Sequence, residues 1–332
     1  MQKTSTENNF DILRLILAIL VFLAHWNILT SQKLSNPFFH LSGYAVDMFF
    51  IVSGFLIFWS FDNDQHKKYF YIKRFFRVFP LYSLLICLQT LFFIFYSNGT
   101  LAQVGKYFIS NILFLNFLSH SVGSTLSFLS VDAINGSLWT LKNEVVFYLC
   151  VPLIFILYKK WGNTFLLLLY GLSLIYMFIV DYLGISKLLV QFPSQLRLFV
   201  VGILFYVMFD KINRKNIYLF AFLSCIALFF FIEYKVFQFT LYPFLLGFIV
   251  IYFVYYVKHI RINFDFSYSF YILHFPVIQL ALYFGINPLN PMVSFISLFC
   301  AILILSYLSE KFIEKRFIQI GKNMVKKSKN NE

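Results

Sequence analysis

Long apolar runs recur along this chain, and they constrain its fold more than any other feature. A transmembrane α-helix needs about 20 mostly apolar residues, with a range of roughly 17–25. Hydrophobic residues make up 60% of the 332 residues and charged residues only 12%, whereas soluble domains carry about 25% charged residues. The pattern therefore predicts an all-α, polytopic membrane helix bundle with about ten transmembrane helices. The predicted spans are residues 12–31, 44–61, 79–97, 141–158, 163–183, 193–209, 217–233, 239–257, 267–284 and 292–309.

One further apolar segment, residues 107–118, is too short to cross a bilayer. It predicts an interfacial or re-entrant helix, with an eleventh span as the alternative. The segment lies in a polar stretch, 98–140, that is rich in Ser, Asn and Gly, and we expect this stretch to shape a substrate entrance. The first apolar run is too long for a signal peptide and contains Arg14, so it predicts a first transmembrane helix.

Lysine and arginine are distributed unevenly between alternate loops, and this predicts the orientation in the membrane. With a cytoplasmic N-terminus, the inner segments hold 20 basic residues and the outer loops hold 4, namely Lys33, Lys106, Lys187 and Lys235. Because cytoplasmic loops carry an excess of Lys and Arg, both termini are predicted to be cytoplasmic. The same rule explains the net charge of +13 without nucleic acid as a partner.

The cysteines Cys87, Cys150, Cys225 and Cys300 each lie inside an apolar run. None has a CxxC partner or the spacing of a metal site. We therefore expect four buried, small, hydrophobic side chains and no metal ligands.

Arg14 and His25 both fall in the first predicted span, where a charged side chain costs about 2.5–3.5 kcal/mol on insertion scales. They are 11 residues apart, so both lie on one helix face, about 16 Å apart along the axis. The pattern indicates a polar shaft with an anion site at Arg14 and a proton-handling imidazole at His25. The alternatives are an Arg14 that snorkels to the membrane surface and a His25 that is an ordinary hydrogen-bonded core residue.

Two acidic residues are predicted in the outer half of the membrane, at the level that His25 can reach. Asp47, in GYAVDMFFIVSGFLI, is placed to orient His25 or to pair with Arg197, and Glu144 opens the fourth predicted span. A histidine with a carboxylate in a low-dielectric cavity forms a general-base pair. The alternatives are an interfacial carboxylate for Asp47 and a favourable helix-dipole interaction for Glu144.

Lys73, Arg74 and Arg77 form a basic cluster in the predicted cytoplasmic loop HKKYFYIKRFFRVFP. Their i, i+3 and i, i+4 spacing brings them together if the segment is helical. Because guanidinium groups bind phosphate through paired hydrogen bonds, the cluster indicates a phosphate site. The alternative is the ordinary positive charge of a cytoplasmic loop.

Five segments in order along the chain resemble the motifs of the acyltransferase family 3 integral membrane proteins, bacterial enzymes that O-acylate cell-surface sugars. Each motif alone is weak, but the five cover the chain from end to end. They are FDILRLILAILVFLAHW with Arg14 and His25, GYAVDMFFIVSGFLI with Asp47, YIKRFFRVFPLY with the basic cluster, LWTLKNEVVFYLCVPL with Glu144, and FSYSFYILHFPV with His274.

The chain departs from the family pattern at four positions. Thr140 replaces the usual Ser, and Lys73 stands for the first Arg of the basic motif. Val145 stands where many members carry a second Glu, so Glu144 alone must do any carboxylate work. Arg316 stands where the family has a Pro after Glu-Lys.

The resemblance implies one membrane domain over residues 1–332, without the fused periplasmic esterase-like domain of some members, in a bacterial inner membrane. It implies an acyl-CoA donor, usually acetyl-CoA, as a co-substrate and not as a bound cofactor. It implies a sugar hydroxyl of an O-antigen, capsule or related lipid-linked or surface glycan as the acceptor. It also implies that Arg14 and His25 are needed for activity.

These inferences combine into an expected mechanism. The CoA phosphates bind the basic cluster below Arg14, and His25 deprotonates the acceptor hydroxyl while Glu144 or Asp47 stabilises the imidazolium. Arg197 and His274 complete the polar shaft. Direct transfer and a covalent acyl-enzyme on Ser53 or Ser137 are both open. The alternative function is a transporter or flippase of lipid-linked sugars, although the sequence lacks the internal repeats typical of that class.

Overall fold

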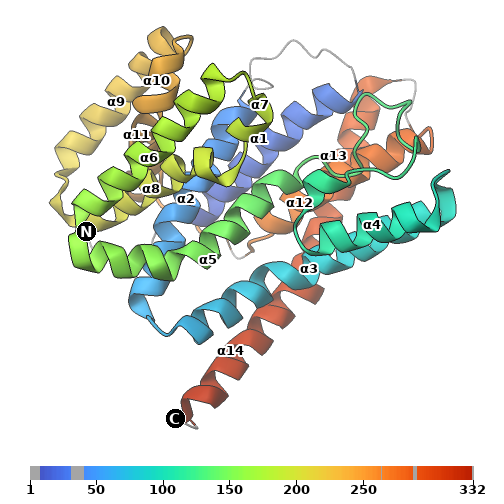
Figure 1. The fold of residues 1–332 in the computed structure, drawn as a ribbon, viewed down its shortest axis with the longest axis horizontal. Coiled ribbons are helices and arrows are strands. Elements are labelled where there is room, and N and C mark those ends of the chain that lie inside the picture. Colours follow the sequence, from blue (N-terminus) through green and yellow to red (C-terminus); the bar gives the residue numbers. More distant parts are fainter. Residues whose placement is uncertain (1–7, 31–40, 263, 287–289, 331–332) are drawn as a thin grey trace. The chain divides into compact units, whose positions relative to one another are not determined.

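A computed structural model describes residues 8–30, 41–262, 264–286 and 290–330 of the chain. These residues form helices and their connections, with no strand among them, so the predicted all-α class is confirmed (Figure 1). Lys33, assigned above to an outer loop, lies outside the described residues. Contacts divide the chain into two compact units, each assembled from segments far apart in the sequence. Unit 1 comprises the segments Met1–Leu17, Gly43–Phe70 and Asn143–Ile262, and unit 2 comprises Ala18–Ser42, Tyr71–Lys142 and Asn263–Glu332.

Three helices contribute at least four residues to each unit: α1 (Phe10–Thr30), α3 (Lys67–Tyr96) and α5 (Leu138–Trp161). Unit 1 also contains α2 (Ser42–Asn63), α6 (Asn163–Tyr182), α7 (Ser186–Leu189), α8 (Phe192–Met208), η3 (Phe209–Lys211), α9 (Arg214–Phe231), α10 (Lys235–Thr240) and α11 (Tyr242–Tyr256). Unit 2 also contains α4 (Leu101–Ile112), η2 (Asn116–Leu118), α12 (Ser267–Tyr283), α13 (Pro291–Ser309), η4 (Glu310–Glu314) and α14 (Lys315–Asn330).

Among the described residues, 7 helical segments are long and apolar enough to cross a membrane. They are α1, α2, α3, α5, α6, the segment Ser186–Lys211 that includes α8, and the segment Pro291–Asn330 that begins with α13. The other predicted spans, 217–233, 239–257 and 267–284, fall on the shorter helices α9, α11 and α12. A helix such as α11, with 15 residues, is about 22 Å long, less than the roughly 30 Å of a bilayer core. The total of ten spans therefore stays a prediction.

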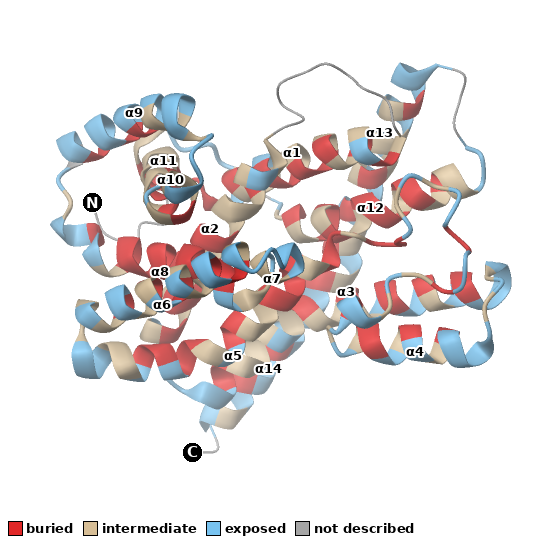
Figure 2. Cartoon of the chain, turned by 45° about the horizontal axis from the view of Figure 1, so that its top comes forward, coloured by how far each residue is buried: buried red, intermediate tan, exposed pale blue. Residues whose placement is uncertain are grey.

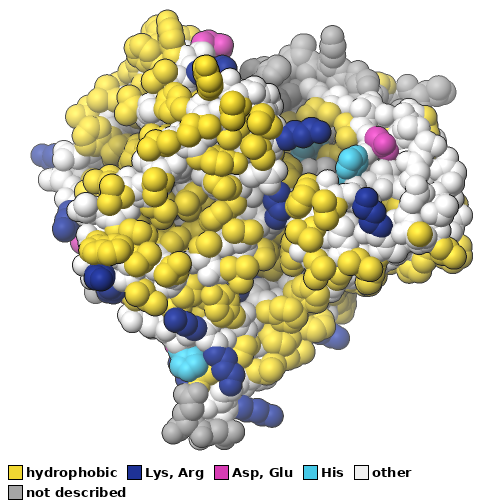
Figure 3. Space-filling view, viewed as in Figure 1, with side chains coloured by type: hydrophobic (Ala, Val, Ile, Leu, Met, Phe, Trp, Pro, Cys, Tyr) yellow, Lys and Arg dark blue, Asp and Glu magenta, His cyan; other side chains and the backbone are white. Residues whose placement is uncertain are grey.

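The surface of these helices is strongly apolar. Leu168 of α6, Phe222 of α9 and Ile304 of α13 are at least 60% exposed, and hydrophobic side chains are spread over much of the face seen in Figure 3. Soluble proteins rarely expose apolar surface on this scale. The surface therefore fits a multi-pass membrane protein, whose outer side chains contact lipid.

The prediction of four buried cysteines is wrong. Cys87, Cys225 and Cys300 are exposed and Cys150 is partly exposed. A thiol on the apolar surface of a transmembrane helix needs no protein partner, because lipid is as apolar as a protein core. The sequence pattern correctly predicted apolar surroundings for the cysteines, but it could not show whether each one faces the protein interior or the outer surface of its helix.

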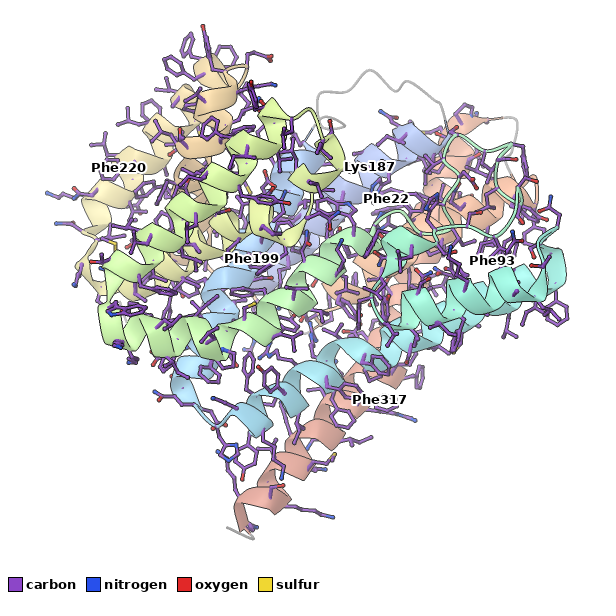
Figure 4. The ribbon with its side chains drawn as sticks, in the orientation of Figure 1. Phe22, Phe93, Lys187, Phe199, Phe220 and Phe317 are labelled. Atoms are coloured by element: carbon purple, nitrogen blue, oxygen red, sulfur yellow. The ribbon has the colours of Figure 1, made fainter. Side chains whose placement is uncertain are left out.

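In unit 1, helices α2 and α8 approach each other through glycine. A Cβ atom at Gly54 of α2 would collide with the carbonyl group of Phe199, and one at Gly202 of α8 would collide with the backbone of α2. Small residues permit this approach in membrane proteins. Phe199 lies between Phe50 and Phe147, with ring centroids 4.8 and 4.3 Å away (Figure 4). Figure 2 shows α8 largely as buried residues, which makes it the central helix of this packing.

In unit 2, the polar stretch after α3 folds as α4 and a long irregular connection. α4 has 12 residues, about 18 Å, so it is too short to cross a bilayer. It begins with a capping box between Thr100 and Gln103, six residues before the start that the sequence suggested. Tyr107 of α4 is fully buried, packs on Phe93 (labelled in Figure 4) and donates a hydrogen bond to Gln89 at 2.6 Å.

The helical turn η4, which joins α13 to α14, is π-helical. Such turns are rare and frequently occur at functional sites. Glu310 and Glu314, at its two ends, are only 3% and 2% exposed. Farther along, α14 packs on α3, where the ring of Phe317 (labelled in Figure 4) stacks on Phe76 and Gly321 lies against the same ring. The basic C-terminal segment is therefore helical and partly packed.

Candidate active site

Two histidines far apart in the sequence meet in unit 2. His25 of α1 and His274 of α12 are 249 residues apart, and Nδ1 of His25 lies 2.7 Å from Nε2 of His274. Their ring planes differ by 16°, which suits an in-plane hydrogen bond between the two nitrogens. His274 is completely buried, whereas His25 is only partly buried. His25 is therefore the more accessible member of the pair.

Aromatic rings hold the pair. Phe275 packs edge-on against His25 with centroids 5.1 Å apart, and Phe22 packs edge-on against His274 at 6.3 Å. Phe22, labelled in Figure 4, lies one turn before His25 on α1 and also contacts Phe270 of α12. The apolar rings surround the two imidazoles with a low-dielectric environment, where a hydrogen bond is electrostatically stronger than in water.

A proline beside His274 fixes the backbone of α12. Pro276 lacks an N–H group, so the carbonyl oxygen of Ile272, four residues earlier, has no helical donor. The side-chain amide of Asn135 donates to this oxygen at 3.0 Å. The irregular connection before α5 therefore clamps α12 within one turn of His274.

The carboxylate of Asp47 lies in unit 1, on α2, together with Tyr242 and Arg197. Tyr242 donates a hydrogen bond to Asp47 at 2.7 Å. Arg197 acts on Asp47 electrostatically, but its side chain donates to the sulfur of Met177 at 2.9 Å and to the carbonyl of Gln238 at 3.4 Å. Within the described part of the chain, no direct ion pair joins Asp47 and Arg197.

Glu144 also lies in unit 1, within α5. The helix begins at Leu138, so Glu144 is its seventh residue and not its first. Because the helix dipole acts within the first turn, the dipole interaction considered above does not explain this carboxylate. Its Oε1 atom accepts hydrogen bonds from the hydroxyl groups of Tyr148 and, at 3.4 Å, Ser53.

The two candidate nucleophiles differ in their surroundings. The hydroxyl of Ser53 faces a carboxylate, which is a group that can take its proton. Ser137 is 1% exposed and donates to the amide oxygen of Asn135 at 2.6 Å. An amide oxygen is not a base, so the geometry favours Ser53 over Ser137 for any covalent step.

Arg14 lies on the second turn of α1, where it forms an ion pair with Asp11 at 2.5 Å. The two side chains are 24% and 54% exposed. An i, i+3 pair of this kind keeps the guanidinium near the start of the helix.

The basic cluster Lys73, Arg74 and Arg77 lies within a helix, because α3 begins at Lys67. Arg77 is held within unit 2 by two carboxylates. Its guanidinium lies 2.8 Å from Asp265, just before α12, and 3.5 Å from Glu314 of η4. Lys315 pairs with the neighbouring Glu310 at 2.8 Å. Arg77 therefore joins α3 to α12 and to the π-helical turn.

Sequence reasoning missed several partners in these contacts. It did not single out Tyr242, Asp265, Glu310 or Glu314, and it did not pair His25 with His274. A signal existed for the glutamates, because two acids spaced i, i+4 directly after an apolar run suggest a buried polar face. The other contacts join segments more than 180 residues apart, and no local pattern marks them.

Comparison with known proteins identifies the class of reaction that this protein carries out. Residues 7–311 match the family model of an acyltransferase domain. The chain belongs to this acyltransferase family. The protein is therefore an enzyme that transfers acyl groups other than aminoacyl groups, and the resemblance of the five motifs is confirmed.

The acyltransferase is similar to three individual proteins, two of which are named as O-acetyl transferases. It is 29% identical to an O-acetyl transferase of Shigella phage Sf6 over 94% of its own length and 96% of the phage protein. It is 28% identical to nodulation protein 10 of Rhizobium leguminosarum bv. viciae over 48% of the chain and 47% of that protein. It is 28% identical to the peptidoglycan O-acetyltransferase OatA of Listeria monocytogenes over 38% of the chain and 21% of that protein. No solved structure matches the acyltransferase at a significant level.

Proposed function

We propose that this acyltransferase moves an acetyl group from acetyl-CoA to a hydroxyl group of a sugar in a cell-surface glycan, with His25 as the general base. The observation that carries the proposal is the partly buried imidazole of His25, held by a second histidine within an apolar helix bundle. Histidine accepts and returns a proton near neutral pH, which transfer to a hydroxyl requires. Two relatives named as O-acetyl transferases support acetyl as the group and oxygen as the acceptor atom.

In the proposed transfer step, His25 carries the proton from the acceptor to the leaving group. His25 removes the proton of the sugar hydroxyl as its oxygen attacks the thioester carbonyl. The new C–O bond forms and the C–S bond breaks, and the proton on His25 then passes to the departing CoA thiolate. General-base catalysis supplies roughly 10²–10⁴-fold, and positioning of the two substrates supplies the remainder. We retain Asp47 and Glu144 as candidates for the carboxylate that stabilises the imidazolium.

The acetyl-CoA donor binds, in this proposal, to basic residues of α1 and α3. Arg74 and Lys73 lie on the first two turns of α3, and Arg14 lies on the second turn of α1. CoA carries phosphates, which guanidinium groups bind through paired hydrogen bonds. Arg77 contributes mainly by holding α3 in place, since its guanidinium is bound by Asp265 and Glu314.

The proposal includes a location in a bacterial inner membrane, with ten spans and both termini in the cytoplasm. This orientation puts the basic start of α3 on the side where acyl-CoA is made. A sugar flippase needs neither a thioester donor nor a base, and the acyltransferase family favours the enzyme. The glycan acceptor is supported by the peptidoglycan named for the Listeria relative.

The test is complementation of a strain that lacks the gene. We expect wild-type protein to restore O-acetyl groups on surface glycans, detected by mass spectrometry, and the His25→Gln variant to restore none. Gln keeps the volume and a hydrogen bond but cannot act as a base. Membrane abundance and thermal stability of the variant must equal those of the wild type. Normal acetylation by His25→Gln would contradict the general-base role, and an unchanged glycan in the deletion strain would contradict the acceptor class.

A further inference from the structure

The second histidine of the pair makes two hydrogen bonds that fix where its proton lies. Nδ1 of His274 lies 3.2 Å from the carbonyl oxygen of Phe270, and Nε2 lies 2.7 Å from Nδ1 of His25. A carbonyl oxygen only accepts hydrogen bonds, so Nδ1 of His274 must carry the proton of the first contact. A neutral imidazole has one N–H group, so Nε2 of His274 carries a lone pair.

The proton positions of His25 follow from this lone pair. Because Nε2 of His274 accepts, Nδ1 of His25 must donate, and neutral His25 then has a bare Nε2 atom. No described residue hydrogen-bonds Nε2 of His25. We infer that His274 is a positioning residue that selects the tautomer of His25 and thereby makes Nε2 the basic atom. This inference rests on the proposed function, in which His25 is the general base.

The surroundings of His274 prevent the opposite arrangement. The side chain is completely buried against Phe22 and Phe270, which are themselves fully buried. Turning the imidazole over would break both hydrogen bonds and leave buried polar atoms without partners, which costs about 1–3 kcal/mol for each group. A doubly protonated His274 would put a charge in an apolar site, which is more costly still.

The two hydrogen bonds from His25 to His274 and from His274 to Phe270, here called the relay, are also compatible with the reaction. When Nε2 of His25 takes the proton of the sugar hydroxyl, Nδ1 keeps its own proton and its bond to His274. Both hydrogen bonds of the relay, from His25 to His274 and from His274 to Phe270, survive the step without movement of either ring. The nearly coplanar rings, 16° apart, keep the lone pair of His274 aimed at the proton of His25 in both states. A preorganised site of this kind needs no rearrangement as charge develops.

The relay predicts different effects of two substitutions at one position. His274→Gln retains an oxygen that accepts from Nδ1 of His25, whereas His274→Leu fills the space without an acceptor. We expect His274→Leu to lower kcat by about 10²–10⁴-fold with little change in KM, because the buried side chain does not touch the substrate. His274→Gln should retain most of kcat. His259→Gln, at an exposed histidine in the connection after α11, is the matched control and should be without effect.

The direct test is ¹⁵N NMR of histidine-labelled protein in lipid nanodiscs, because the ¹⁵N chemical shift separates protonated from unprotonated ring nitrogens. The His25 signals are assigned by their loss in His25→Gln. We expect a protonated Nδ1 and a bare Nε2 for His25 in the wild type and in His274→Gln, and a mixture of tautomers in His274→Leu. A bare Nδ1 in the wild type would overturn the relay, as would equal loss of kcat in Leu and Gln variants that fold normally. The expected tautomers in a protein without acyl transfer would support the relay and contradict only the proposed function.

Discussion

Arg77 is the residue for which the structure changes the expected consequence of mutation most. Sequence reasoning assigned it to phosphate binding, but its guanidinium lies 2.8 Å from Asp265 and 3.5 Å from Glu314. The Glu314 side chain is 1% exposed, so removing Arg77 strands a nearly buried carboxylate. Breaking a buried ion pair costs about 3–5 kcal/mol. Since the Arg77 side chain is 23% exposed, we expect a loss near the lower end, about 3 kcal/mol, for Arg77→Ala.

The assay is thermal unfolding of the purified protein in detergent, with acetyl-CoA affinity measured in parallel. Arg77→Ala should lower the unfolding midpoint by several degrees. Adding Glu314→Gln removes the stranded charge, so the double variant should be more stable than Arg77→Ala alone. Lys68→Ala, at an exposed lysine of the same helix, is the control and should unfold like the wild type. Wild-type stability of Arg77→Ala together with a lost affinity for acetyl-CoA would refute the structural role.

Three further predictions concern packing, donor binding and topology. Gly202→Leu should lower the free energy of unfolding by about 1–3 kcal/mol or more, because it overpacks the contact between α2 and α8. Gly171→Ala, with open space around the glycine, should leave the free energy of unfolding unchanged or raise it by about 0.4–1 kcal/mol. Thermal unfolding of the two variants tests this difference. Arg74→Ala should weaken acetyl-CoA binding, measured by calorimetry, without affecting acceptor use, because its guanidinium is proposed to bind phosphate. Reporter fusions at Lys106 and Lys187 should both report the outer side of the membrane, and a cytoplasmic signal at Lys187 would overturn the ten-span topology.

The sequence predicted the existence of the long helices well, because an apolar run long enough to cross a membrane rarely forms any other structure. The first predicted span, 12–31, begins two residues after the start of α1 at Phe10. The sequence pattern missed helix starts that are polar, because it detected helices by their apolar residues. α3 begins at Lys67, 12 residues before the predicted span, because its first turns are basic and hydropathy does not detect a charged helix. The early start of α5 likewise moved Glu144 away from the helix terminus.

The candidate site was predictable residue by residue but not pair by pair. A histidine or carboxylate inside an apolar span stands out in the sequence, because such residues are costly in a membrane. Their partners depend on how distant helices pack, and that depends on the summed contacts of many side chains. His25 was expected beside a carboxylate, but its hydrogen-bond partner within unit 2 is His274. Arg77 was expected to face a ligand, but it binds two acids that the sequence places far from it.

The most direct test of the account is CoA release by the purified protein in liposomes. Free thiol is measured after acetyl-CoA is added, with and without a surface glycan as the acceptor. The account predicts glycan-dependent thiol release by the wild type, transfer of labelled acetyl to the glycan, and neither with His25→Gln. Equal thiol release by the wild type and His25→Gln in the presence of the glycan would contradict it.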